Sequence, residues 1–173
     1  MARPDGLVTG FLPVLTPDEL NYCAVLADRN SEKSKRAEDK SGVSLPRSKR
    51  DPVGVAGENA VWLALHDFPW WTPIDPFYPT DVGDYQVRTR SKDGYGLLIQ
   101  PRNEDDEIFI HVVRLSPLEY RVGGWLRAGD AKQEEFRMNP GVEDDPTRRE
   151  CWIVPEDRLN PMGNLPGMAL RYL

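Results

Sequence analysis

The chain has few of the residues from which transition-metal sites and disulfides are built. Its 173 residues include only two cysteines and two histidines. Cys23 and Cys151 lie far apart, in apolar settings, without a C-x-x-C motif or a neighbouring pair of histidines. This composition favours small buried thiols over a disulfide and disfavours a zinc site of the usual Cys/His kind. Any bound metal would have to be a hard cation held by oxygen atoms.

Long apolar runs are also missing. No stretch approaches the roughly 20 apolar residues that a membrane-spanning helix needs. The apolar stretch near the N-terminus is too short and too interrupted to predict a signal peptide. We therefore expect a cytoplasmic protein with no membrane partner. The length of 173 residues predicts a single domain over residues 1–173.

An overall positive charge, which is typical of nucleic-acid-binding proteins, is absent as well. The formal net charge is −6, which argues against a globally basic binder. Residues 33–50 differ, because seven basic side chains against two acidic ones give this segment +5 and leave −11 elsewhere. Residues 30–52 have no periodic apolar positions, so a flexible loop and a phosphate-contacting arm both remain open. The basic side chains that such an arm would present to DNA are Lys33, Lys35, Arg36, Lys49 and Arg50.

Two helices are predicted in the first half of the chain. Thr16 is a good N-cap, and Glu19 three residues later completes a capping box. Apolar residues at helical spacing between residues 53 and 66 predict the second helix, with Glu58 in its first turn. A carboxylate there is explained either by the favourable helix dipole or by a role as a metal ligand. An extended, aromatic-rich connector is predicted over residues 67–79, because proline blocks helix and central strand alike.

The second half predicts strands. Side chains of a strand point alternately to its two faces. Over residues 85–90 this alternation places Gln86, Arg88 and Arg90 on one face of a half-buried strand. A turn at residues 92–94 and the apolar residues 97–99 predict a hairpin. Residues 108–115 predict a central strand buried on both faces. A strand at 120–126 follows, in which Gly123-Gly124 indicates a bulge or a close approach of the backbone. A short helix at 131–136 and a short strand at 152–154 complete an α+β or α/β fold with a mixed central sheet flanked by helices.

Asp81 followed by Gln86-Val87-Arg88, with GENAVWLAL upstream, resembles the core of the PD-(D/E)xK nuclease-like proteins of phages and prophages. The resemblance covers most of the chain as a series of short motifs. It implies a restriction-endonuclease-like fold and a metal-dependent endonuclease or exonuclease that acts on DNA. The implied cofactor is Mg²⁺ or Mn²⁺, held at the edge of the sheet.

Residue by residue, the resemblance assigns Glu58 to the helix carboxylate, Asp81 to the aspartate at the start of the strand, Gln86 to the glutamate and Arg88 to the lysine. The carbonyl of Val87 would complete the metal shell, and Arg90 would contact nucleic acid. Gln86 and Arg88 depart from the family pattern. A neutral amide binds a hard cation more weakly than a carboxylate, and arginine cannot act as a base.

Two alternatives remain open from the sequence. Asp84 competes with Asp81 as the site carboxylate, although a Gly-Asp pair at a tight turn is explained by turn chemistry alone. The polar face of the strand could also be a degenerate site. The protein would then be a non-catalytic module that binds nucleic acid or a protein partner.

Overall fold

The structure is a computed structural model that describes residues 12–28, 52–66, 80–138 and 150–167. The predicted connector at 67–79 and all of the basic arm except its last residue lie outside the described residues. The roles of Lys33, Lys35, Arg36, Lys49 and Arg50 therefore remain predictions. Among the described residues, no helix has the length and apolar character needed to cross a membrane.

Residues 17–28 form the first helix, and its predicted capping box is confirmed. The Glu19 amide donates to Thr16 Oγ1 at 3.2 Å, and the Thr16 amide donates to Glu19 Oε2 at 2.7 Å. The side of this helix that faces the core includes Cys23, a buried free thiol as predicted. Burial raises the pKa of this thiol to about 11, so it remains protonated near neutral pH.

Helix α2 spans Pro52–His66 and begins earlier than the prediction that put Glu58 in its first turn. The first turn holds no acidic residue, because Pro52 takes the first helical position, where its missing N–H costs nothing. The helix-dipole explanation of Glu58 is therefore wrong. Gly57 also lies inside α2 and not at the start of a helix. Glu58 is instead a buried carboxylate within α2, with 7% of its surface exposed.

The first sheet contains β1 (Tyr85–Arg90), β3 (Ile108–Arg114) and β4 (Tyr120–Arg127) in the order β1-β3-β4. It is mixed, since β1 pairs with β3 in parallel and β3 pairs with β4 antiparallel. The predicted central strand is confirmed as β3, whose five inner residues are all buried. The predicted bulge is also confirmed, because the partners of His111 and Val112 are Gly124 and Val122, which leaves Gly123 unpaired.

A second sheet contains β2 (Leu97–Ile99), β5 (Arg137–Met138) and β6 (Cys151–Val154) in the order β2-β6-β5. The predicted hairpin of β1 and β2 is therefore wrong, because the two strands lie in different sheets. A parallel β1–β3 pair needs a crossover connection, and β2 lies within that connection. Gly96 allows the crossover to pass close to β6, since a Cβ at this position would collide with the Val154 carbonyl.

Short helices connect the remaining strands. Helix α3 spans Ala128–Ala131, and a 3-10 turn follows at Glu134–Phe136, so the single helix predicted over 131–136 is two separate pieces. A second 3-10 turn, Glu156–Arg158, follows Pro155. A further 3-10 turn, Met162–Asn164, packs against β4.

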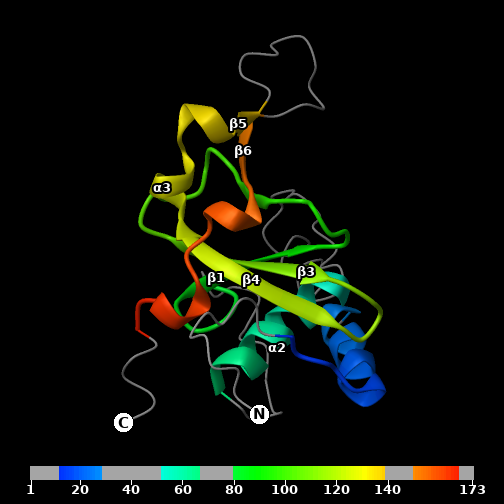
Figure 1. Ribbon diagram of the computed structural model, residues 1–173. Coiled ribbons are helices and arrows are strands. Elements are labelled where there is room, and N and C mark those ends of the chain that lie inside the picture. Colours follow the sequence, from blue (N-terminus) through cyan, green and yellow to red (C-terminus); the bar gives the residue numbers. More distant parts are fainter. Residues whose placement is uncertain (1–11, 29–51, 67–79, 139–149, 168–173) are drawn as a thin grey trace, which may run out of the picture.

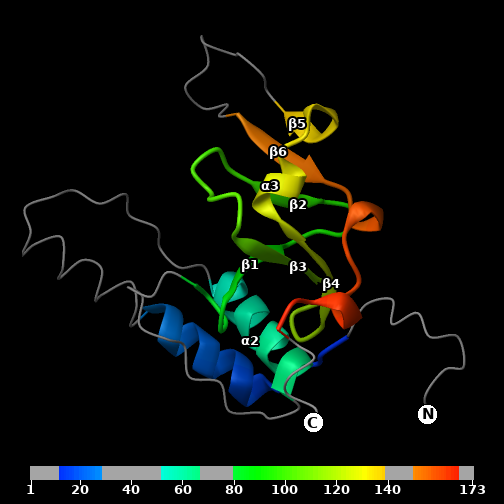
Figure 2. The ribbon, with the colours of Figure 1, turned by 90° about the vertical axis from the view of Figure 1, so that its left-hand side faces the viewer.

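The elements form layers around the first sheet (Figures 1 and 2). Helix α2 and the first helix lie on one face, where Val87, Ile110 and Val122 join the larger apolar cluster. The other face carries Phe109 and Leu126, which pack with β2, β6 and α3 in a second cluster. The α+β content and the mixed sheet agree with the prediction. Among the described residues, one face carries α2 and the first helix, and the other carries the second sheet together with the short helix α3.

Candidate cation site at the free edge of β1

Strand β1 is an edge strand, since β3 is its only partner in the described sheet. A tight turn, in which Gly83 has a φ of 57°, folds the chain before β1 back alongside it. The turn brings Asp81 to the free edge, where its Oδ2 accepts the backbone N–H of Val87 at 2.9 Å. Asp81 therefore occupies part of the position that a neighbouring strand would take.

Arg88 reaches the same edge. Its Nη1 donates to the carbonyl oxygen of Val87 at 3.3 Å and lies 3.9 Å from Asp81 Oδ2. The guanidinium also stacks over the ring of Phe109, 4.8 Å from the ring centre. Burial lowers the pKa of Arg88, and the carboxylates of Asp81 and Glu107 oppose that shift. The group remains a cation, because an arginine side chain keeps its proton in proteins.

Two of the four oxygens predicted to hold a metal ion therefore already contact a cation. The N–H and C=O of one strand residue point to the same side, so Asp81 and the Val87 carbonyl converge at the free edge. The positive charge between them is the guanidinium of Arg88. The guanidinium of Arg88 therefore lies beside both of these oxygens.

Gln86 lies on the predicted face of β1 but turns toward another carboxylate. Its Nε2 donates to Glu107 Oε1 at 3.4 Å, and Glu107 Oε2 accepts the Glu104 amide at 3.0 Å. Glu107 was not among the predicted site residues, so its participation here was missed. The parallel register, in which Tyr85 lies opposite Ile108, brings Glu107 beside β1, and no local pattern in the sequence predicts that pairing.

Glu58 acts on the site at longer range. Its negative charge opposes the lowering of the Arg88 pKa by burial, but more weakly than the charges of Asp81 and Glu107 do. It also contributes to the raised pKa of Cys23 on the first helix. Asp81, Val87 and Arg88 are thus in direct contact, Gln86 joins them through the neighbouring Glu107, and Glu58 is linked to them electrostatically.

The two candidate carboxylates, Asp81 and Asp84, differ in their contacts at this edge. Asp84 is exposed in the turn, where a short polar side chain is expected. Asp81 is the residue that binds the Val87 amide and neighbours Arg88. Asp81 therefore remains the candidate ligand.

The donors at this edge are oxygens, which suit a hard ion such as Mg²⁺ or Mn²⁺. Among the described residues, no three histidine, cysteine or acidic side chains form a group that could hold a metal ion. An ion would instead depend on Asp81, Glu58, the Gln86 amide and the Val87 carbonyl. It would also have to displace the guanidinium of Arg88 from the Asp81 carboxylate.

Comparisons of this chain with protein-family models, with curated proteins and with solved structures find no match. The resemblance to PD-(D/E)xK nuclease-like proteins therefore rests on the sequence motifs alone. Function has to be argued from the residues at the edge of β1.

Proposed function

We propose that this protein is a nuclease-like protein that acts on DNA phosphodiesters with a divalent ion, on a restriction-endonuclease-like fold. The observation that supports the proposal best is the convergence of Asp81 Oδ2, the Val87 carbonyl and a bound positive charge at one sheet edge. Carboxylate and carbonyl oxygens are the ligand types that hard divalent ions take. The helix layer on a mixed sheet is compatible with the proposed fold.

In this proposal Glu58, Asp81, Gln86 and the Val87 carbonyl would hold Mg²⁺ or Mn²⁺. A bound ion would supply Lewis-acid stabilisation and a water of lowered pKa. Glu107 would add negative charge beside Gln86, where the neutral amide provides none. Arg88, once released from Asp81, could bind two phosphate oxygens in a bidentate manner. It would stabilise charge there and could not serve as the base.

A second candidate is a non-catalytic module that binds nucleic acid or a protein partner. The specific observation in its favour is again Arg88, whose contacts with Asp81 and Val87 satisfy this edge without an ion. Binding to DNA would then need no divalent ion and would weaken steeply with salt as counterions are released. Binding that is insensitive to salt would indicate a protein partner.

Incubation of the purified protein with linear, nicked and branched DNA in Mg²⁺ or Mn²⁺ tests the first proposal. We expect cleavage of at least one substrate, with loss of cleavage in Asp81→Ala. Asp84→Ala is the matched control, since Asp84 lies in the same turn but is exposed. Absence of cleavage from all three substrates, or cleavage that survives Asp81→Ala, would contradict the catalytic proposal.

A further inference from the structure

A pocket of about 310 Å³ opens at the C-terminal end of β1 and is lined by residues that the cation site does not use. Two of its lining side chains are cationic, Ser91 is exposed and carries a hydroxyl group, and Tyr95 supplies an aromatic ring, whereas the Thr89 hydroxyl is buried. The lining residues are Thr89, Arg90, Ser91, Lys92 and Tyr95. This combination offers donors and positive charge for a phosphate beside an aromatic surface for a planar ring.

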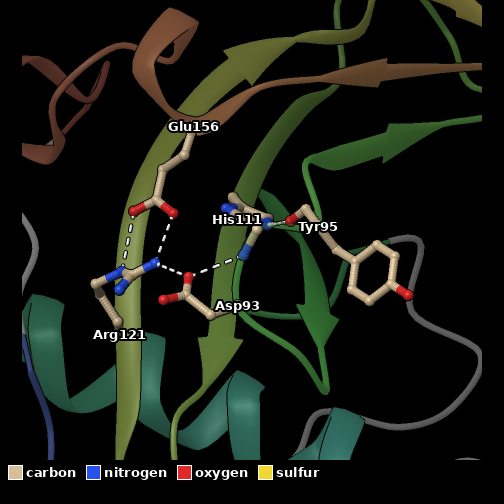
Figure 3. Close-up of polar contacts among 6 residues, drawn as sticks. Asp93, Tyr95, His111, Arg121 and Glu156 are labelled. Atoms are coloured by element: carbon tan, nitrogen blue, oxygen red, sulfur yellow. Dashed lines mark hydrogen bonds and ion pairs between the residues drawn. The ribbon is translucent and has the colours of Figure 1, made fainter.

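The loop that forms one wall of the pocket is held at several points (Figure 3). Asp93 Oδ1 accepts a hydrogen bond from Arg121 Nη2 at 2.6 Å, and His111 Nε2 lies 3.0 Å from the Tyr95 carbonyl oxygen. Arg121 is itself held by two hydrogen bonds to Glu156. Figure 3 shows the Tyr95 ring pointing away from this network. A loop fixed in this way loses less conformational entropy when a ligand binds.

The positive charges of the pocket are not neutralised by nearby carboxylates. Arg90 donates its Nε–H to the Gly96 carbonyl at 3.1 Å and lies 5.7 Å from the centre of the Tyr95 ring. Within the described part of the chain, neither Arg90 nor Lys92 forms an ion pair. Tyr95 keeps 51% of its surface exposed. Among the described residues, the pocket thus presents two cations that form no ion pair with a carboxylate, beside an accessible ring.

We propose that this pocket binds one nucleotide of single-stranded DNA, with its phosphate on Arg90 and Lys92 and its base stacked on Tyr95. The inference rests on the proposed function, and it specifies the substrate class as DNA with unpaired bases. An unpaired base is required because a base inside a duplex has no free face for Tyr95. The alternation of β1 puts Arg90 on the same face as Arg88, so one strand could pass both residues.

Fluorescence anisotropy with a labelled single-stranded oligonucleotide of roughly 10 nucleotides, in EDTA, tests the pocket apart from catalysis. We expect Tyr95→Leu to weaken binding about 5- to 100-fold, as loss of one stacked base does. Arg90→Gln and Lys92→Gln should each weaken binding and reduce the slope of log K against log salt by about 0.7. A blunt duplex of the same sequence should bind more weakly than the single strand.

Matched controls are available elsewhere on the molecule. Tyr22→Leu removes a tyrosine of similar exposure, 47%, from the first helix. Arg158→Gln removes another guanidinium that stacks on a ring, 5.9 Å from the centre of Phe136. Both controls should bind DNA like the unaltered protein, and thermal unfolding should show that Tyr95→Leu is folded.

The results of the binding experiment test the nucleotide-binding pocket independently of the catalytic proposal. Binding that depends on Tyr95 and Arg90 supports the pocket even if no DNA is cleaved. Equal binding by Tyr95→Leu and the unaltered protein would overturn the pocket, even if cleavage is observed. Preference for the blunt duplex, or full competition by millimolar inorganic phosphate with no effect of Tyr95→Leu, would also overturn it.

Discussion

His111 is fully buried in β3, with 0% of its surface exposed, and makes an incomplete set of hydrogen bonds. Its Nε2 must carry the hydrogen in the contact with the Tyr95 carbonyl, because a carbonyl can only accept. Its Nδ1 has no hydrogen-bond partner among the described residues. Burial lowers the pKa of His111, and Glu156 opposes that shift, while Arg90 and Arg121 add to it. The folded protein therefore favours the neutral imidazole.

This preference makes stability depend on pH. Below the ordinary histidine pKa of about 6.5, the unfolded chain binds a proton that the folded chain resists, so stability is lost as pH falls through that range. Urea unfolding between pH 5 and 8 should show this slope, and His111→Gln should reduce it. His66→Gln, which alters the partly exposed histidine of α2, is the control. An unchanged slope in His111→Gln would contradict this account.

Single positions at the β1 edge were only partly predictable. The sequence singled out Asp81 and Arg88 correctly as neighbours, because both belong to one short segment whose turn and alternation can be read locally. Glu107 was missed because it reaches Gln86 through the pairing of β1 with β3. Partners distant in the sequence leave no periodic signal.

At the scale of elements, local periodicity predicted the helices and most strands, but it did not predict how they pair. The capping box, the buried strand β3 and the bulge of β4 are each predicted by a pattern of a few consecutive residues. The assignment of β1 and β2 to different sheets depends instead on β6, more than 50 residues later in the sequence than β2. A turn between two strands therefore suggested a hairpin that does not form.

The packing of α2 on β1 provides an element-level prediction. Gly57 faces Thr89 so closely that an added Cβ would collide with its side chain, whereas Gly54 of the same helix has open space. We expect Gly57→Ala to lower the free energy of unfolding by about 1–3 kcal/mol through overpacking. Gly54→Ala should instead raise it by roughly 0.5–1 kcal/mol through helix propensity. Equal effects of the two substitutions in urea unfolding would show that this contact is not tight.

At the scale of the whole molecule, an acidic chain with a net charge of −6 presents Arg88, Arg90 and Lys92 along one strand and its following loop. Composition alone argued against a nucleic-acid binder, but a local cationic surface can act within a Debye length of about 8 Å at physiological salt. Arg88 and Arg90 share one face of β1, and Lys92 follows in the loop after the strand. The sequence predicted the polar face of β1 but not the pocket, whose wall depends on contacts with β3 and β4.

The cation site at the edge of β1 is tested most directly by binding of Mn²⁺, measured by electron paramagnetic resonance without DNA. The unaltered protein should bind weakly, because Arg88 competes for Asp81. Arg88→Gln should bind roughly tenfold more tightly or better, since a charge within 4 Å interacts by more than 1 kcal/mol in a partly buried setting. Asp81→Asn should lose binding. Mn²⁺ binding that is equal in all three proteins, or absent from Arg88→Gln, would contradict the site.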